Sequence, residues 1–314
     1  MTSSAPPSRF TPSQYNLTNI HTSLDYHGYC ILQDFLPNPA QLRHDFQQNI
    51  LNHTPTGRNR FEGEYTKRAY SLFAKTRAFD SIVTNPFLLQ IIEDILESKH
   101  FLLSSTVGIS IGPGERAQPL HRDDGKYPVG NLVRGWPHKE IVFNCIIAID
   151  DFTAGNGGTI LYPGSHQWEY EGENEYATQT VLPNTLTKRS STQNDTETKT
   201  SIQDIIPQLR DEQASSSSSF KNHQKISCEM KAGSIMLYRG SLLHGGGENK
   251  SKKPRLGVLL EFVSAWLRPQ ENHLIGVPKE IVKTLPLKLQ EMLGWCVSPP
   301  FIGYVDGRDP KSRL

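Results

Sequence analysis

Three side chains of this sequence have the types needed to bind a catalytic metal ion. His121 and Asp123 are separated by one residue, and His244 lies far downstream in a Leu-His-Gly-Gly-Gly run. Two neutral imidazole nitrogens and one carboxylate oxygen suit Fe(II), and binding on one face leaves coordination positions open for other molecules. An isolated His-x-Asp is common in surface turns. The whole set, however, predicts a mononuclear iron site that performs catalysis.

The spacing of these residues indicates which elements must position them. On a β-strand, residues i and i+2 point to the same face, so His121 and Asp123 can meet one ion while Arg122 points away. A histidine remote in sequence must come from a strand that is adjacent in space, as in a barrel of antiparallel strands. We expect His244 to follow such a strand at residues 234–238.

Arg255 stands at the head of the apolar run Arg-Leu-Gly-Val-Leu-Leu-Glu-Phe. Charged side chains are rarely buried without a partner, and the planar guanidinium matches a carboxylate in a bidentate manner. The position therefore predicts a binding site for a ligand carboxylate. The alternative is an arginine at a strand end that reaches solvent.

The order of these motifs resembles the phytanoyl-CoA dioxygenase (PhyH) family of Fe(II)/2-oxoglutarate oxygenases, and in particular its fungal secondary-metabolite members. The motifs are His-x-Asp, a Thr159 within Gly-Gly-Thr-Ile-Leu-Tyr-Pro-Gly-Ser-His, then His244, Arg255 and the run at residues 265–272. The resemblance covers most of the chain. It implies a double-stranded β-helix, or jelly roll, and a homodimer.

Position by position, the resemblance implies a role for each motif residue. It makes His121, Asp123 and His244 the iron ligands, and it makes Arg255 the anchor for the distal carboxylate of 2-oxoglutarate. Gln118 and Thr159 match positions that also contact this co-substrate, and an amide and a hydroxyl are able to bind carboxylate oxygens. His166 is expected to close a turn rather than bind iron. Halogenating relatives have Gly or Ala where Asp123 stands, so we expect oxygen chemistry.

The expected function is Fe(II)/2-oxoglutarate-dependent oxidation of a hydrophobic small molecule with O₂, by hydroxylation, desaturation, epoxidation or rearrangement. One alternative is a peroxisomal acyl-CoA 2-hydroxylase of the phytanoyl-CoA type, for which Lys250, Lys252 and Lys253 offer a small basic cluster. An alternative of another class is a non-catalytic β-barrel that binds a ligand. Aromatic residues that line the substrate pocket, or else belong to the core, are Tyr65, Tyr70, Phe73, Trp136 and Trp266.

Periodicity predicts a mainly β protein with flanking helices. Residues 1–12 read as a flexible arm and residues 13–314 as a single domain. Apolar residues at helical spacing predict helices ending near residues 52 and 97 and a last helix at 279–293. Short β-rich runs predict strands at 101–111, 141–149, 159–162, 226–230, 234–238 and 256–262, the pattern of a jelly roll. A Ser/Thr-rich insertion at about 171–225 is either a lid or a solvated spacer.

Composition narrows the partners and the compartment. The net charge of +1 gives no basic field for nucleic acid, and no apolar run approaches the roughly 20 residues of a membrane span. Four separated cysteines without a signal peptide predict reduced thiols in an intracellular protein. The C-terminal Ser312-Arg313-Leu314 is close to the Ser-Lys-Leu address read by the peroxisomal import receptor. We expect a frayed terminus there, with the cytoplasm as the alternative location.

Overall fold

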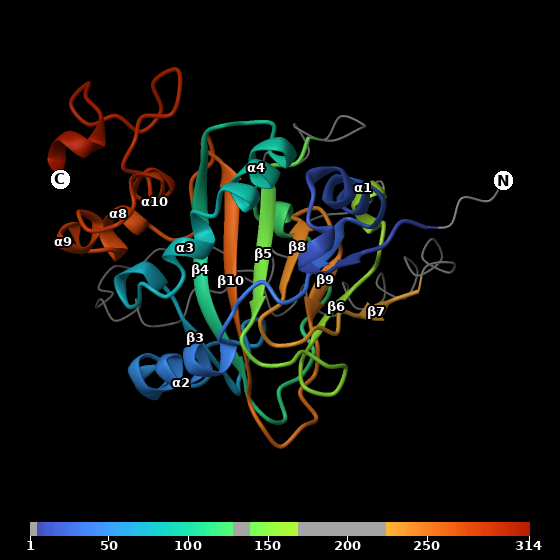
Figure 1. Ribbon diagram of the computed structural model, residues 1–314. Helices are drawn as coiled ribbons and strands as arrows, with labels where there is room; N and C mark the ends of the chain where they lie inside the picture. Colours follow the sequence, from blue (N-terminus) through green and yellow to red (C-terminus); the bar gives the residue numbers. More distant parts are fainter. Residues whose placement is uncertain (1–4, 128–138, 169–223) are drawn as a thin grey trace, which may run out of the picture.

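The computed structural model describes residues 5–127, 139–168 and 224–314 (Figure 1). Within these ranges the chain forms two β-sheets that pack against one another. The larger sheet has seven strands in the order β1-β2-β8-β5-β10-β4-β3, and the smaller has three in the order β7-β6-β9. The strands of the larger sheet are β1 (Arg9–Phe10), β2 (Tyr29–Leu32), β8 (Ile235–Arg239), β5 (Val142–Ala148), β10 (Arg255–Ser264), β4 (Phe101–Ile111) and β3 (Thr66–Ala69). Those of the smaller are β7 (Ile226–Ser227), β6 (Thr159–Leu161) and β9 (His244–Gly246).

Strand β10 separates the hydrophobic core from the interior of the sheet pair. Successive side chains of a strand point to opposite faces. Leu256, Val258 and Leu260 join the large core on the outer face, whereas Leu259 and Glu261 line a cavity on the other. The strand therefore contributes to packing with one face and to a binding site with the other.

Helices cover the outer face of the larger sheet (Figure 1). They are α1 (Leu17–His27), α2 (Pro39–Asn49), α3 (Asp80–Val83) and α4 (Pro86–Ile95), and their apolar residues belong to the same core as the outer side chains of β10. Helix α4 begins after Asn85, whose side chain accepts hydrogen bonds from the N–H groups of Phe87 and Leu88. Helix α2 packs so closely that a Cβ at Gly108 would lie 2.3 Å from the ring of Phe46. Only glycine allows this approach.

The strands predicted at residues 101–111, 141–149, 159–162, 234–238 and 256–262 are present as β4, β5, β6, β8 and β10, and the helices predicted to end near residues 52 and 97 are present as α2 and α4. Other elements differ from expectation. The predicted helix at 279–293 is two short helices, α9 (Lys279–Val282) and α10 (Leu287–Met292). Pro286 separates them because it has no N–H to donate and disfavours helical geometry at the residue before it. The strand predicted at 226–230 ends at Ser227, and Met230 forms only an isolated bridge with Phe152. Helix α1 and strands β2 and β3 were not predicted.

Both ends of the described chain are more ordered than expected. Arg9 and Phe10 form β1 beside β2, and Phe10 is buried, so the predicted arm ends before residue 9. At the other end, Pro310–Arg313 form a short 3₁₀ helix capped by Asp309, and Leu314 packs partly buried against the core. Lys279 also donates a hydrogen bond of 3.0 Å to the backbone carbonyl of Arg313. The terminus is not frayed.

None of the helices that the structure describes is both long enough and apolar enough to span a membrane.

Candidate active site

His121, Asp123 and His244 come together between the two sheets. Their ligand atoms all lie within 4.8 Å of one another. His121 and His244 form a reciprocal backbone bridge, with N–H to carbonyl distances of 2.8 and 2.9 Å, which extends the smaller sheet beyond β9. The bridge fixes the relative position of residues that are far apart in sequence.

The His-x-Asp motif is not in a regular strand, as we expected it to be. Arg122 has extended geometry, with φ −117° and ψ 133°, while Asp123 begins the 3₁₀ helix η4 (Asp123–Lys126). One extended residue is enough to place the side chains of His121 and Asp123 on the same side. The predicted convergence is therefore present without the predicted strand.

Both imidazole rings are held with Nε2 toward Asp123. Nδ1 of His121 is 2.9 Å from the carbonyl of Pro119, and Nδ1 of His244 is 2.9 Å from that of Leu242. Because a carbonyl only accepts, each Nδ1 carries a proton, and each Nε2 is the ring nitrogen left to face a metal ion. Burial, with the neighbouring His244 adding to it, lowers the pKa of His121 to about 3. His121 is thus neutral at physiological pH, as a metal ligand must be.

The carboxylate of Asp123 is ionised and oriented by its surroundings. Its Oδ2 lies 3.3 Å from Nε2 of His244 and accepts a hydrogen bond of 3.0 Å from the amide of Asn144. Burial opposes ionisation, but the ammonium group of Lys126, 3.2 Å from Oδ1, together with His244 and His121, outweighs it and keeps the pKa of Asp123 well below its usual value. Two imidazole nitrogens and one carboxylate oxygen that converge in this way fit Fe(II).

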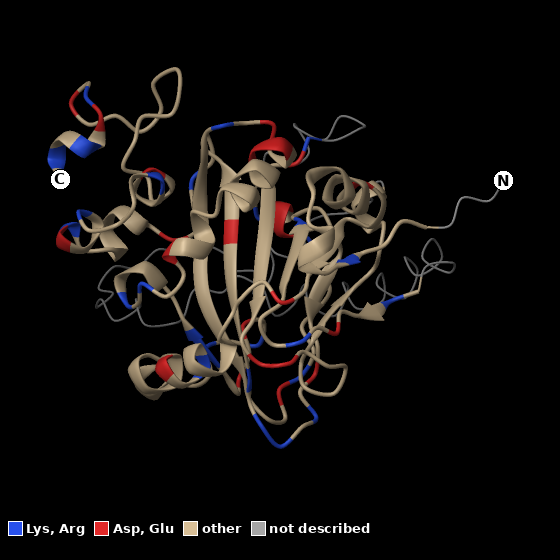
Figure 2. Cartoon of the chain, viewed as in Figure 1, with Lys and Arg blue, Asp and Glu red and all other residues tan. Residues whose placement is uncertain are grey.

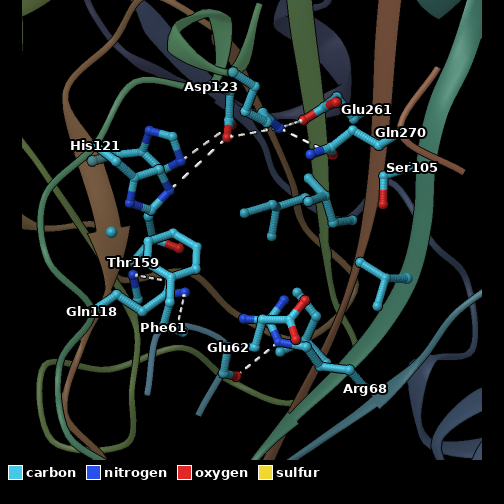
Figure 3. Close-up of a pocket in the computed structure, with 18 of the residues that line it drawn as sticks. Phe61, Glu62, Arg68, Ser105, Gln118, His121, Asp123, Thr159, Glu261 and Gln270 are labelled. Atoms are coloured by element: carbon cyan, nitrogen blue, oxygen red, sulfur yellow. Dashed lines mark hydrogen bonds and ion pairs between the residues drawn. The ribbon is translucent and has the colours of Figure 1, made fainter. Parts of the chain in front are cut away.

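A cavity of about 500 Å³ opens beside the three ligands (Figure 3). Small-molecule sites usually enclose about 300 to 1,000 Å³. The apolar part of its wall comes from the inner faces of the central strands, and its polar part includes the three ligands and several charged side chains. Its lining includes Phe61, Glu62, Arg68, Tyr70, Val107, Ile109, Ile146, Leu259, Glu261 and Gln270.

Arg255 lines the same cavity and is 5% exposed. Its guanidinium lies 3.8 Å from the ring centre of Phe152 and donates to the carbonyl of Gly157, while its Nε has no hydrogen-bond partner among the described residues. Burial, opposed by the charge of Asp150 and reinforced by a smaller contribution from Arg68, lowers the pKa of Arg255 to about 9. No Asp or Glu in the described part of the chain forms an ion pair with it. The structure thus leaves the fork of Arg255 available for an anionic ligand.

Gln118 and Thr159 lie on the cavity wall as well. The side chain of Gln118 accepts a hydrogen bond of 2.8 Å from the N–H of Gly246 and donates one of 2.9 Å to the carbonyl of Phe61. It therefore links the β9 segment to the Phe61 loop. Thr159 is the first residue of β6 and is buried. All six residues taken from the motifs surround one cavity.

Comparison with known proteins identifies the family. A family model described as phytanoyl-CoA dioxygenase (PhyH) matches residues 24–257. The chain belongs to the phytanoyl-CoA dioxygenase (PhyH) family. The expected resemblance is confirmed.

Curated relatives of this PhyH-family chain are fungal dioxygenases. The chain is 29% identical to the dioxygenase aneA of Aspergillus aculeatus, over 74% of this chain and 64% of aneA. It is 26% identical to the dioxygenase olcK of Penicillium canescens, over 89% of this chain and 80% of olcK. It is 30% identical to the dioxygenase ALT11 of Alternaria alternata, over 75% of this chain and 65% of ALT11. The aligned part thus spans about two thirds of aneA and ALT11.

Solved structures show the fold of the PhyH-family chain. The non-haem α-ketoglutarate-dependent carbocyclase SnoK from nogalamycin biosynthesis has a TM-score of 0.56 at 15% identity, covering 87% of this chain and 94% of SnoK. HygX from Streptomyces hygroscopicus, solved with nickel, 2-oxoglutarate and hygromycin B, has a TM-score of 0.54 at 14% identity, covering 81% of this chain and 90% of HygX. The jelly-roll prediction is confirmed.

Of the five aromatic residues predicted to line the pocket of the PhyH-family chain, the structure places Tyr70 there. Tyr65, which precedes β3, is 57% exposed and does not line the cavity. Phe73 lies in the hydrophobic core, and Trp266 is 46% exposed after the end of β10. Trp136 lies outside the described residues, and so do residues 171–223 of the predicted insertion.

His166 stays outside the metal group of the PhyH-family chain. Its Nε2 is 3.0 Å from the carbonyl of Asp25. It lies two residues after Gly164, whose φ of 78° turns the chain. The expectation of a turn-closing role agrees with this position.

Four cavity residues carry charges that the sequence reading of this PhyH-family chain missed. They are Glu62, Arg68, Lys126 and Glu261. The sequence does point to Glu261, since a carboxylate inside an otherwise apolar strand, the red band on β10 in Figure 2, requires a partner. No such signal marks Arg68 or Lys126 in the sequence, because both stand in polar runs.

Glu140 binds Ser241, in the segment that leads to His244 of the PhyH-family site, and its pKa leads to a prediction about the pH dependence of stability. Glu140 accepts hydrogen bonds from the N–H (3.1 Å) and the hydroxyl (2.8 Å) of Ser241. Burial, opposed by Arg239, raises its pKa from 4.5 to about 7. Since the folded state then binds more protons, the free energy of unfolding should fall as pH rises from 4.5 to 7, by at most about 3 kcal/mol.

Urea unfolding of wild-type and Glu140→Gln protein across this pH range checks the prediction. The difference between the two free energies should change with pH in the stated direction, because glutamine does not titrate. A difference that is constant with pH would show that Glu140 has an ordinary pKa.

Proposed function

We propose that this chain is a non-haem Fe(II)/2-oxoglutarate-dependent dioxygenase that oxidises a hydrophobic fungal secondary metabolite. The observation that carries the proposal is the cavity itself, which has two histidines and one carboxylate at one place and, at another, a buried arginine that forms no ion pair with a carboxylate of the described residues. This pairing places a metal site and an anion site on the wall of one cavity.

The chain's own residues bind and orient the reactants. His121, Asp123 and His244 hold Fe(II), which, when bound, supplies the redox chemistry with O₂ that converts 2-oxoglutarate to succinate and CO₂ while the substrate is oxidised. Arg255 binds the distal carboxylate of 2-oxoglutarate, and Arg68 adds a second positive charge near it. Gln118 and Thr159 complete this wall. Phe61, whose ring centre is 5.0 Å from that of His121, shields this histidine from water.

The apolar wall of the cavity and the fungal dioxygenase relatives support a hydrophobic metabolite as substrate. The acyl-CoA alternative is not favoured: Lys250 is paired with Glu248 at 3.1 Å, and Lys250, Lys252 and Lys253 do not line the cavity of the described residues. The complete ligand set speaks against a non-catalytic binding protein. Asp123 occupies the position that halogenation would require to be empty.

The test is to load purified protein with Fe(II) and to measure succinate release from 2-oxoglutarate under air. A panel of hydrophobic fungal metabolites is then screened for mass gains of one oxygen atom or losses of two hydrogens that depend on 2-oxoglutarate. Protein that binds iron but never releases succinate, with or without the panel, would contradict the proposal.

We also propose that the chain forms a homodimer through its C-terminal region. Ile275 (81% exposed), Leu287 (68%) and Phe301 (76%) place large apolar side chains in solvent within residues 273–314, a part that stands beside the larger sheet (Figure 1). A second copy would remove this surface from water. Light scattering of Phe301→Asp protein should then show a monomer, while Tyr26→Asp, at an exposed tyrosine elsewhere, stays dimeric. A wild-type monomer would reject the dimer.

For location we propose the peroxisome. Ser312-Arg313-Leu314 carries the address, although Leu314 and the carbonyl of Arg313 are engaged by the fold and must detach before a receptor reads them. A fluorescent protein fused to the N-terminus should give a punctate signal that becomes diffuse when residues 312–314 are removed. A diffuse signal from the intact fusion would place the protein in the cytoplasm.

A further inference from the structure

Lys126 links the metal ligand Asp123 to a buried carboxylate. It ends η4, and residues three apart in a 3₁₀ helix lie on the same side, so it stands next to Asp123. Its Nζ lies 3.2 Å from Oδ1 of Asp123 and 3.2 Å from Oε1 of Gln270, and it donates a hydrogen bond to Oε2 of Glu261. Figure 3 shows this series of contacts running from Asp123 to Glu261.

Glu261 has no exposed surface and projects from the cavity-facing side of β10. The pairing of β10 with β4 shifts register between Glu261 and Phe262, an irregularity of the kind that re-aims side chains near active sites. On its other edge β10 pairs with β5, and there Glu261 lies opposite Asn144, the residue whose amide binds Oδ2 of Asp123. The carboxylate of Asp123 is thus held at both oxygens, by Lys126 and by Asn144.

We propose that Lys126 is a positioning residue for the metal: it fixes the carboxylate of Asp123 for coordination, and Glu261 keeps the ammonium group in place. Groups that hydrogen-bond to a metal ligand orient it and tune its affinity. The inference rests on the proposed function, because it requires a divalent metal at His121, Asp123 and His244. It adds two residues that do not touch the metal.

A purely structural ion pair would behave differently from a positioning pair. Replacing both partners of a buried ion pair by apolar residues of similar size often leaves stability unchanged or raises it. The double variant Lys126→Met/Glu261→Leu removes the contact to Asp123 without leaving Glu261 as a buried, unpaired charge, and Asp123 keeps its hydrogen bond from Asn144. It separates the effect on folding from the effect on the metal site.

The experiment titrates Co(II) into the metal-free protein and records its visible spectrum, with thermal unfolding of the metal-free protein measured in parallel. The double variant should still unfold in a cooperative transition, bind Co(II) about 10 to 100 times more weakly and show an altered spectrum. Lys126→Gln/Glu261→Gln, which keeps both side chains polar but removes both charges, should weaken Co(II) binding in the same way, and it decides the matter if the first variant does not fold. Lys231→Met/Asp151→Leu removes an exposed ion pair of 2.8 Å and should change neither affinity nor spectrum.

Unchanged Co(II) affinity and spectrum in the folded double variants would overturn the inference. Wild-type protein whose Co(II) affinity is the same as that of His244→Ala would overturn both this inference and the metal site of the proposed function. Wild-type protein that binds Co(II) through the three ligands but releases no succinate with Fe(II) would reject the proposed function alone. The Co(II) titration of the double variants would then still decide whether Lys126 affects metal binding.

Discussion

Alanine at His121, Asp123 or His244 is expected to weaken iron binding strongly and to reduce turnover to about a few per cent or less. Each ligand supplies one of three donor atoms that lie within 4.8 Å of one another, and two remaining donors do not hold a metal with the open face that the chemistry requires. The measurements are the iron content of the purified protein and succinate release. Asp123→Gly should keep part of the iron, since it opens a coordination position, yet lose oxygenation.

Asp124→Asn is the matched control for this set. Asp124 is adjacent to Asp123 and equally buried, at 4% exposed, but it does not belong to the group of converging ligands. The iron content of Asp124→Asn protein should equal that of wild-type protein. Substantial turnover in any one of the three alanine variants would mean that the metal is held elsewhere.

The second large effect is expected at Arg255. Losing one partner of a buried, hydrogen-bonded charge pair costs about 2 to 5 kcal/mol, which corresponds to an increase of roughly 30- to 4,000-fold in the 2-oxoglutarate concentration that Arg255→Ala requires. Iron binding should survive, because Arg255 is not a ligand. The measurement is the KM for 2-oxoglutarate, taken with the iron content of the same preparation.

Two further variants make the test of Arg255 specific. Arg255→Lys keeps the charge but loses the planar fork, so its KM should lie between those of wild-type protein and Arg255→Ala. Lys253→Ala removes an exposed charge two residues earlier and should leave the KM unchanged. If Arg255→Ala requires no more 2-oxoglutarate than wild-type protein, the co-substrate is bound elsewhere in the cavity.

The central strands and the metal ligands could be predicted because their signals are local. Strand β4 and strand β10 are long β-rich runs, and the three ligands stand in recognisable motifs. Helix α1 was missed because Leu17, Ile20 and Leu24 are separated by Thr, Asn and Ser, which form helices poorly. Strand β3, with Lys67 and Arg68 at its centre, owes its structure to pairing with β4 and not to its own propensity.

The same distinction explains which site residues were missed. Lys126 and Glu261 are 135 residues apart in the sequence, and their contact depends on where β10 passes η4. No spacing rule connects them. Tyr65 and Tyr70 show the reverse error. The aromatic character of both suggested a pocket, but they flank the short strand β3, and of the two it is Tyr70 that lines the cavity.

The alternating faces of β10 give neighbouring positions different tolerance to mutation. Val258 and Leu260 are enclosed by the helix-covered core, so changes in their volume are expected to lower the yield of folded protein. Leu259 borders the cavity, where a larger or smaller side chain alters which molecules fit and leaves that core intact. Selection at such a position acts on substrate range almost independently of stability. Directed evolution of this protein would therefore start at Leu259 and would leave its two neighbours in the strand unchanged.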